Sequence, residues 1–174
     1  MEFIKIPHER IATLIGERGK TKKQLEEACE VKLNVDEDGE VEINGDTSHT
    51  YFAKDVIKAI GRGFSVHEAL KIIKENYGFY LIDLDEFAKT EKAITRIKGR
   101  IIGEKGKMKK EIESATESFL SIYGDTVGII SKIDTMEYAK EAISMLIDGA
   151  QHSHVFNYLA KIKRQIMGER LTGK

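Results

Sequence analysis

The sequence predicts an α+β protein made of two copies of one small domain. A hexapeptide occurs twice, as "IGERGK" at 15–20 and as "IGEKGK" at 102–107. Around it, nine of the 16 residues from 14 to 29 are identical to those 87 positions later. Farther on, "FAKDVIKAI" (52–60) resembles "YAKEAISML" (138–146). The period is too long for a solenoid repeat, so these observations indicate a duplicated domain.

Each copy is expected to run β-α-α-β-β-α with an extra helix at its C-terminal end. Alternating apolar residues predict the strands, and apolar residues at helical spacing predict the helices. In the first copy we expect strands at 3–6, 31–35 and 40–43, and helices up to residue 15, after residue 19, at about 48–60 and at 66–73. In the second copy we expect strands at 80–84, 119–123 and 127–130, and helices at 86 to about 102, 107–117, about 135–147 and 152–167.

The hairpin of each copy has the same inward-facing pattern. Leu33, Val35, Val41 and Ile43 correspond to Leu120, Ile122, Val127 and Ile129. We place the first domain at 1–76 and the second at 77–174. No Pro- or Ser-rich linker separates them, so we expect the two domains to pack against each other.

Composition excludes several classes of function. The chain has 28 basic and 29 acidic residues, a net charge of −1, so any attraction to nucleic acid must come from local patches. Cys29 is the single cysteine, which rules out an intramolecular disulfide and a cysteine-ligated zinc cluster. Residues 1–10 contain no apolar signal core, and no run approaches 18 apolar residues. We therefore expect a cytoplasmic protein that does not interact with membranes.

The two hexapeptides have the residues of a phosphate-binding loop. Glycine lacks a Cβ, so Gly16 and Gly19 can adopt backbone angles that other residues avoid and let a phosphate approach the main chain. The following residues open a helix, whose first N–H groups attract anions. Lys20 and Lys23 are like charges at i and i+3 near that helix start, an arrangement that a bound phosphate would relieve.

The segments "IATLIGERGKTKKQL" and "KGRIIGEKGKMKKEI", together with the order of elements, resemble the type I KH domain. The resemblance implies two tandem KH domains that bind single-stranded RNA or DNA, each Gly-x-x-Gly loop clamping about four nucleotides. A compact chain of two KH domains further resembles the small-subunit ribosome-assembly factors of the Dim/Krr/Pno type. The first loop is degenerate in eukaryotic members of that family, so the intact Gly16–Gly19 loop matches an archaeal form. This resemblance implies a role in maturation of the 3′ region of small-subunit ribosomal RNA, with protein partners such as an endonuclease.

The predicted RNA-binding residues are the two loops and the basic positions around them. They are Gly16, Glu17, Arg18, Gly19, Lys20, Lys22, Lys23, Arg96, Lys98, Arg100, Gly103, Glu104, Lys105, Gly106, Lys107, Lys109 and Lys110. The net charge is +3 over 9–23 and +6 over 96–110, which predicts that the second domain contributes more electrostatic affinity. Sequence readout is expected in the groove between the loop-flanking helices and the hairpin, at positions such as Ile11, Ile15, Lys98, Ile102, Lys32–Asn34 and Ser121.

No catalytic residue, metal site or cofactor is predicted. "GKT" at 19–21 lacks the earlier glycine of a P-loop, because Leu14 occupies that position. His152 and His154 lack a third ligand nearby in sequence, and Asp83, Asp85 and Glu86 suit the start of a helix better than a nuclease site. The basic segment 161–174 is either a frayed tail or an additional RNA contact.

Two other functions remain open at this point. One is a protein-interaction scaffold in which one KH copy, more readily the first, binds a protein face instead of RNA. The other is an RNA-binding subunit of an RNA-degradation or transcription complex.

Overall fold

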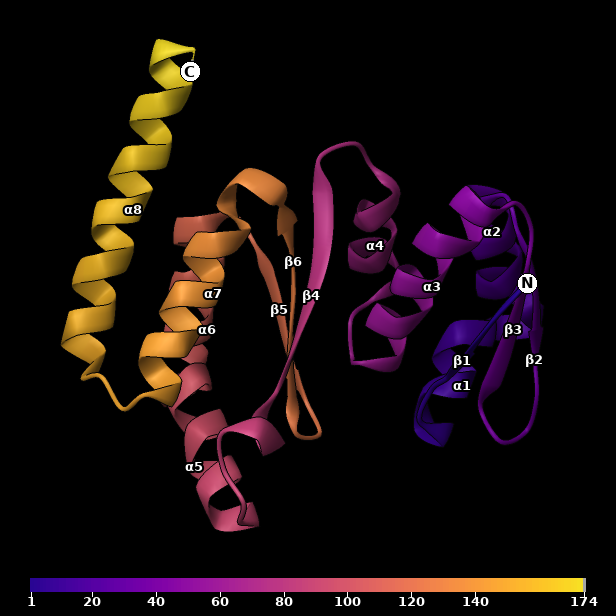
Figure 1. Ribbon diagram of the computed structural model, residues 1–174, viewed down its shortest axis with the longest axis horizontal. Coiled ribbons are helices and arrows are strands. Elements are labelled where there is room, and N and C mark those ends of the chain that lie inside the picture. The colour runs from indigo at the N-terminus through magenta and orange to yellow at the C-terminus, as the bar shows by residue number, and fades with distance from the viewer. Residues whose placement is uncertain (174) are drawn as a thin grey trace. The chain divides into compact units, whose positions relative to one another are not determined.

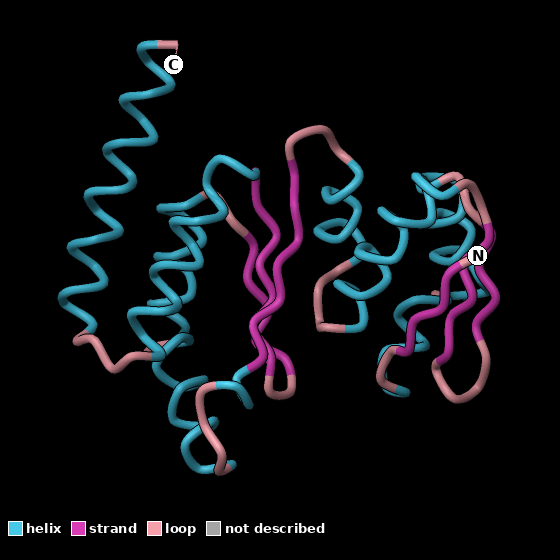
Figure 2. The backbone as a smooth tube through the Cα atoms, in the orientation of Figure 1, coloured by secondary structure: helices cyan, strands magenta, loops and turns pink. Residues whose placement is uncertain are grey.

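The computed structural model describes residues 1–173, which form two compact units, one up to residue 79 and one from residue 80 onward. Each unit has a three-stranded sheet. Figures 1 and 2 show helices along one face of each sheet. No helix within residues 1–173 combines the length and apolar character needed to cross a bilayer. The predicted α+β architecture is confirmed.

The first unit has the predicted β-α-α-β-β-α order. Its sheet has the strand order β1-β3-β2. Its elements are β1 (Glu2–Lys5), α1 (His8–Ile15), a 3₁₀ turn η1 (Glu17–Gly19), α2 (Lys20–Cys29), β2 (Lys32–Val35), β3 (Glu40–Asn44), α3 (Thr47–Gly61), α4 (Val66–Ala69) and a 3₁₀ turn η2 (Leu70–Ile73).

The second unit repeats this order with strands β4-β6-β5. Its elements are β4 (Tyr77–Asp83), a 3₁₀ turn η3 (Leu84–Glu86), α5 (Glu91–Ile102), a 3₁₀ turn η4 (Glu104–Gly106), α6 (Lys107–Thr116), β5 (Phe119–Tyr123), β6 (Thr126–Lys132), α7 (Ile133–Ile147) and α8 (His152–Thr172). The strand β4 begins before the unit boundary, so the backbone continues from one unit to the next without a loop at that point.

The hairpin register is the same in both units. Leu33 pairs with Ile43 and Val35 with Val41, and likewise Leu120 pairs with Ile129 and Ile122 with Val127. Because side chains alternate across a strand, these pairs share one face, and that face lies under the helices. The predicted inward face of both hairpins is thereby confirmed.

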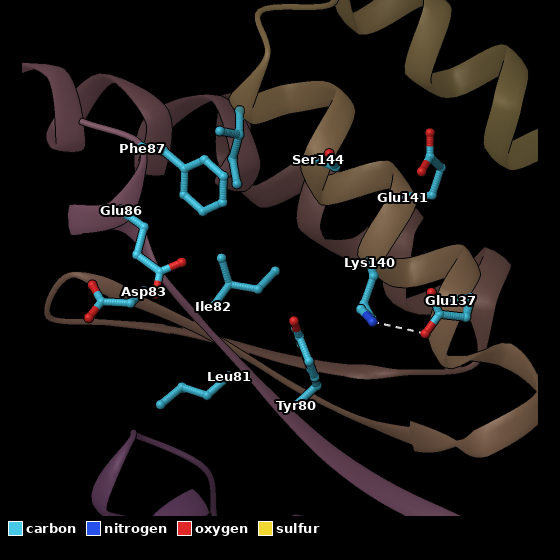
Figure 3. Close-up of a pocket in the computed structure, with 11 residues that line it drawn as sticks. Tyr80, Leu81, Ile82, Asp83, Glu86, Phe87, Glu137, Lys140, Glu141 and Ser144 are labelled. Atoms are coloured by element: carbon cyan, nitrogen blue, oxygen red, sulfur yellow. Dashed lines mark hydrogen bonds and ion pairs between the residues drawn. The ribbon is translucent and has the colours of Figure 1, made fainter.

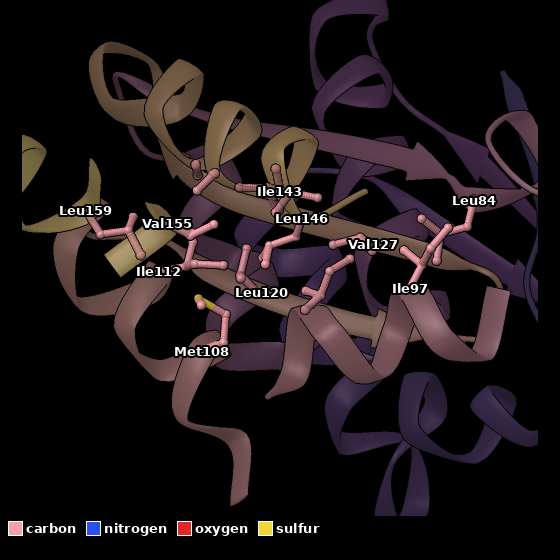
Figure 4. Packing of buried hydrophobic residues seen from close by; sticks show 14 of the residues in the cluster. Leu84, Ile97, Met108, Ile112, Leu120, Val127, Ile143, Leu146, Val155 and Leu159 are labelled. Carbon is pink, nitrogen blue, oxygen red and sulfur yellow. The ribbon is translucent and has the colours of Figure 1, made fainter. Parts of the chain in front are cut away.

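A continuous apolar core holds the second unit together. Residues from the sheet and from all four helices meet in it, among them Leu84, Ile97, Met108, Ile112, Leu120, Val127, Ile143, Leu146, Val155 and Leu159 (Figure 4). All ten are no more than 8% exposed. Burial of this apolar surface fixes α5 and α6 on the sheet, and those two helices carry the second Gly-x-x-Gly loop between them.

Three expectations about the helices were wrong. The helix expected from Glu86 begins at Glu91, because residues 84–86 form a 3₁₀ turn and the Thr90 hydroxyl accepts the Ala93 N–H as an N-cap. The segment 66–73 is one α-helical turn followed by a 3₁₀ turn. The last helix is longer than expected and continues to Thr172, so the segment 161–172 is helical.

Candidate nucleic-acid interface

The two Gly-x-x-Gly loops have the same backbone conformation. Gly16 and Gly103 have φ/ψ of 72°/178° and 74°/174°, and Gly19 and Gly106 have 75°/11° and 74°/14°. Between them, Arg18 and Lys105 lie in the left-handed region at φ 51° and 52°. Three positive φ angles within four residues are unusual for any chain. Their recurrence at both sites shows that the duplication has kept this geometry.

The two glycines of each loop have different surroundings. A Cβ on Gly16 would lie 2.6 Å from the Thr21 Cβ and 2.9 Å from the Thr21 nitrogen. A Cβ on Gly103 would likewise lie 2.7 Å from the Met108 Cβ and 2.8 Å from its nitrogen. By contrast, a Cβ on Gly19 or Gly106 would meet no atom within 4 Å. The first glycine therefore lets the loop pack against the following helix, while the second leaves open space at the helix start.

A helix begins at the open side of each loop. The N-caps of α2 and α6 are Gly19 and Gly106, and neither helix receives a side-chain capping hydrogen bond or an acidic residue in its first turn. The first N–H groups of a helix lack internal partners and carry partial positive charge. An anion such as phosphate would satisfy these groups. The first residues of these helices are Lys20 and Lys107, which add full positive charge beside the same N–H groups.

Two of the predicted lysines belong to a structural clamp. The Lys22 ammonium lies 3.8 Å from the Glu26 carboxylate, and the Lys109 ammonium lies 3.2 Å from that of Glu113. The same carboxylates accept backbone N–H groups of the hairpin, at Leu33 (2.9 Å) and Leu120 (2.8 Å). Each lysine thus supports the carboxylate that joins α2 to β2 or α6 to β5.

Arg100 is engaged in binding the end of α7. Its guanidinium donates to the carbonyl oxygens of Leu146, at 3.2 Å, and Ala150. In the first unit, Arg10 donates to the equivalent carbonyls of Ile60 (2.8 Å) and Phe64 (3.0 Å). The two arginines lie at different positions of their helices, so the sequence alignment does not pair them. Both supply additional donors to carbonyl groups at the end of a helix, where Ile60 and Leu146 also accept the backbone N–H groups of Gly63 and Gly149.

The other predicted cations divide into tethered and exposed ones. Lys98 donates to the Gly124 carbonyl oxygen at 2.9 Å and lies 3.4 Å from the Asp125 carboxylate, so it binds the turn of its own hairpin. The Lys107 ammonium lies 5.2 Å from the centroid of the Phe156 ring on α8, within cation–π range. Among the predicted cations, those that are exposed and form neither an ion pair nor a ring contact with the described residues 1–173 are Arg18, Lys20, Lys23, Arg96, Lys105 and Lys110. Each unit thus has three such cations, whereas the sequence predicts a net charge of +3 around the first loop and +6 around the second.

A hollow of about 520 Å³ lies beside the first loop. It is lined by His8, Ile11, Ala12, Ile15, Gly16 and Glu37. Ile11 and Ile15 are two of the positions predicted for base readout. Among the hairpin positions predicted with them, Lys32 lines a different hollow, which it shares with Lys23, and the Asn34 amide donates to Glu42. At the second loop, the side chain of Ile102 is 37% exposed.

The hairpin turn beside the first loop is acidic. Asp36, Glu37 and Asp38 are all exposed, and the Asp36 carboxylate holds the turn by accepting the N–H groups of Asp38 and Glu40. The second hairpin has only Gly124 and Asp125 in its turn, and Asp125 pairs with Lys98. The sequence predicts strands at 31–35 and 40–43, but the spacing of the acidic residues between them does not show that Glu37 lines the same hollow as Gly16.

Other reactive groups have ordinary structural surroundings. The Cys29 thiol is buried, and burial raises its pKa to about 11, so it is protonated at neutral pH. The His152 ring packs edge-on against Phe156. Within residues 1–173, no group of three His, Cys, Asp or Glu side chains converges as a metal site requires.

Both halves of the chain match family models. Residues 78–164 match the model described as "Eukaryotic type KH-domain (KH-domain type I)", and residues 1–59 match that of the KH domain. This chain belongs to the KH-domain family. Its two KH domains stand in tandem, each with its own Gly-x-x-Gly loop, as the sequence predicts.

Similar proteins align with most of this chain or with part of it. The KH domain-containing protein MJ0443 of Methanocaldococcus jannaschii is 39% identical over 98% of this chain and 77% of its own length. The pre-rRNA-processing protein PNO1 of Chaetomium thermophilum is 31% identical over 60% of this chain and 42% of its own. A solved complex of a/eIF2alpha, aDim2p and rRNA from Pyrococcus horikoshii OT3 contains a similar chain, with a TM-score of 0.87 and 38% identity over 94% of both chains.

Proposed function

We propose that this protein is a non-catalytic adaptor that binds single-stranded RNA with two Gly-x-x-Gly loops during maturation of small-subunit ribosomal RNA. The observation that carries the proposal is the pair of loops with matching backbone angles, each opening onto an uncapped helix start with a lysine as its first residue. An RNA backbone supplies phosphates at the spacing of successive nucleotides, so one loop and one helix start can bind several of them. The named relatives are a pre-rRNA-processing protein and a component of an rRNA complex, which supports this substrate class.

The proposed interface is smaller than the predicted set of residues. It consists of both loops with the exposed cations Arg18, Lys20, Lys23, Arg96, Lys105 and Lys110, together with Lys107. We assign Lys22, Lys109 and Arg100 to the support of the fold, because each holds a carboxylate or carbonyl of its own domain. Lys98 is assigned to both roles, since its ammonium joins α5 to the hairpin turn, the two elements between which base readout is expected.

We further propose that the second KH domain begins at residue 77. The strand β4 begins there and belongs to the sheet of the second domain. The first domain then covers 1–76 and the second 77–174. The adaptor is proposed to act in the cytoplasm without catalysing a reaction, and to work with protein partners such as an endonuclease of ribosomal RNA processing.

A fluorescent single-stranded oligoribonucleotide taken from the 3′ region of small-subunit ribosomal RNA tests this function. If the loops contact about six to eight phosphates, log K should fall with log salt at a slope of roughly −4 to −6. A scrambled oligonucleotide of equal length and a duplex of the same sequence are the controls. A slope near zero, or equal affinity for the duplex, would contradict the proposal.

A second function is favoured by one observation at the first domain. Asp36, Glu37 and Asp38 give the first hairpin turn three exposed carboxylates, of which Glu37 lines the same hollow as Gly16, and this charge repels phosphate. A KH domain with this border suits a protein partner, and the first domain is accordingly the candidate for a scaffold role. The Arg18→Asp variant of the intact chain distinguishes RNA binding from protein binding by the first domain. If the first domain binds only protein, the affinity for the ribosomal oligonucleotide should not change.

A further inference from the structure

The second domain has a hollow of about 370 Å³ away from its Gly-x-x-Gly loop, between the edge strand β4 and the helix α7 (Figure 3). Tyr80 and Ile82 of β4 form one wall, Phe87 closes one end, and Lys140 and Ile147 of α7 lie opposite. Large apolar groups are left accessible there, since Phe87 is 53% exposed and Tyr80 is 42% exposed. Exposed aromatic side chains gathered around a hollow are characteristic of interaction sites.

This hollow depends on an insertion that the first domain lacks. The N–H groups of Ile6 and Leu84 donate to the hairpin-turn carbonyls of Gly39 and Asp125, so Ile6 and Leu84 are equivalent positions. The helix α1 begins two residues after Ile6, whereas α5 begins seven residues after Leu84. The five additional residues of the second domain bring Glu86 and Phe87 to the hollow.

The equivalent place in the first domain is closed by an ion pair. Lys54 of α3 lies 2.8 Å from the Glu2 carboxylate of β1. At the matching position of α7, the Lys140 ammonium lies 4.2 Å from the centroid of the Tyr80 ring and 2.9 Å from the Glu137 carboxylate. The strand thus presents an aromatic ring in the second domain where it presents a carboxylate in the first.

The rim of the hollow is strongly acidic. Asp83, Glu86, Glu137 and Glu141 give it four carboxylates against the single ammonium of Lys140, a net charge of −3. The hydrogen bond to Glu137 raises the pKa of Lys140, so this lysine stays charged and remains paired with Glu137. No cation within residues 1–173 pairs with Glu86 or Glu141. The rim therefore repels nucleic acid and attracts basic groups.

The strand that borders the hollow can also accept a partner. In the order β4-β6-β5, β4 has a neighbour on one side only, and it is seven residues long where β1 has four. An edge strand presents unpaired N–H and C=O groups to which an extended peptide can add as a further strand. A groove between an edge strand and a helix is one of the recurring sites for peptides that bind in this way.

We propose that this hollow, the β4–α7 groove, binds an extended segment of a protein partner that contains lysine or arginine residues. An apolar side chain of the segment occupies the space between Phe87 and Ile147. Its basic side chains pair with Glu86 and Glu141, and its backbone runs along the edge of β4. The inference concerns a protein partner and does not depend on the RNA-binding function of the loops.

The test uses the full chain, free of RNA, and two synthetic peptides. The first probe is a seven-residue peptide with valine at its centre, lysine two residues away on each side, and threonine at the other four positions, so that valine and both lysines lie on one face of the added strand. The second has the same apolar residues with glutamate at each basic position. Amide shifts in ¹⁵N-labelled protein locate the binding site and give the affinity. We expect the basic peptide to shift residues 80–87 and 137–147, and the acidic peptide to shift none of them.

Two variants and a matched control test the contacts. Glu86→Lys combined with Glu141→Lys should weaken binding of the basic peptide at least about tenfold, because two attractions become repulsions. Phe87→Ser should weaken it about fivefold through loss of apolar contact at an exposed site, where folding is little affected. The control, Glu27→Lys with Glu75→Lys, makes the same change of charge at exposed positions outside the β4–α7 groove and should change binding by less than about twofold.

Several results would overturn the inference. These are absence of shifts at millimolar basic peptide, shifts centred outside the β4–α7 groove, equal binding of the acidic peptide, or equal weakening by the control variant. Concentration-dependent dimerisation of the free chain that Glu86→Lys with Glu141→Lys abolishes would assign the groove to a second copy instead. Protection of the same amides by the oligoribonucleotide would assign it to RNA.

Discussion

The two KH domains share the backbone of their Gly-x-x-Gly loops but differ in the charges around them. Corresponding φ and ψ angles of the loop residues differ by no more than 4°. The first loop shares a hollow with Glu37, which belongs to a hairpin turn with three exposed carboxylates, whereas the one carboxylate of the second turn is paired with Lys98. The backbone geometry of the loop has thus been kept twice, while the charge of the neighbouring hairpin turn has diverged.

The arginines that support the ends of α3 and α7 also differ between the domains. Arg10 and Arg100 bind equivalent carbonyl groups although they occupy non-equivalent positions on their helices. Conserved geometry can therefore be met by residues that do not align. A count of basic residues along the sequence cannot distinguish such structural arginines from cations available to RNA.

The largest expected effect concerns the two glycines within each loop. Gly16→Ala and Gly103→Ala should each lower the free energy of unfolding of their own domain by about 3 kcal/mol, because the new Cβ meets the backbone of the next helix at a positive φ. Gly19→Ala and Gly106→Ala should cost only about 1 kcal/mol, since the space there is open and only the left-handed backbone is strained. Urea unfolding of the four variants measures this. Equal losses at first and second glycines would contradict the packing distinction.

The next effect concerns the structural arginines. Arg10→Met and Arg100→Met should each lower the free energy of unfolding by about 2 kcal/mol, through loss of charge-assisted hydrogen bonds to helix-end carbonyls. The exposed Arg96→Met is the matched control and should change stability by less than about 0.5 kcal/mol. If Arg100→Met instead left stability unchanged and weakened RNA binding strongly, Arg100 would be assigned to the RNA interface.

A smaller effect separates the two loops in RNA binding. Lys105→Asp should weaken binding of a single-stranded oligoribonucleotide about tenfold, and Arg18→Asp about threefold, because the acidic turn already weakens phosphate binding at the first loop. Fluorescence anisotropy at one fixed salt concentration gives both values. A loss at Arg18 equal to or greater than that at Lys105 would show that the hairpin charge does not govern the difference.

The smallest effect tests the acidic turn itself. Glu37→Gln should strengthen RNA binding about twofold at low salt, with the gain fading at high salt as screening shortens the range of the charge. Glu75→Gln removes the same charge from an exposed position outside the hollow beside the first loop and should leave the RNA affinity unchanged. An equal gain from both would mean that net charge, rather than the turn, is responsible.

Much of the fold could be predicted from the sequence, because the patterns that indicate strands and helices are local and occur in both copies of the domain. The alternation of Leu33 and Val35 predicted the hairpin face, and the duplicated glycines predicted the break between two helices. The start of α5 was predicted wrongly. Acidic residues at 83–86 and the N-cap residue Thr90 both favour a helix start, and the sequence pattern alone does not choose between them.

The interface was predicted less completely, because a side chain's availability depends on tertiary contacts. The loops and their helix starts follow from short-range rules. The partners of Arg100 and Lys98 lie 46 and 26 residues away in sequence, so their engagement cannot be read from spacing. The β4–α7 groove was missed for the same reason, since its walls come from segments more than 50 residues apart.

The most direct test of the central claim changes one residue in each loop. Aspartate tolerates the left-handed backbone at positions 18 and 105, so Arg18→Asp with Lys105→Asp should leave the urea midpoint unchanged while reversing the charge at both loops. We predict that this double variant binds the ribosomal oligoribonucleotide about thirtyfold more weakly, with a salt slope shallower by about 1 to 2. Affinity and salt slope equal to those of the unchanged protein would show that the Gly-x-x-Gly loops do not bind the RNA backbone.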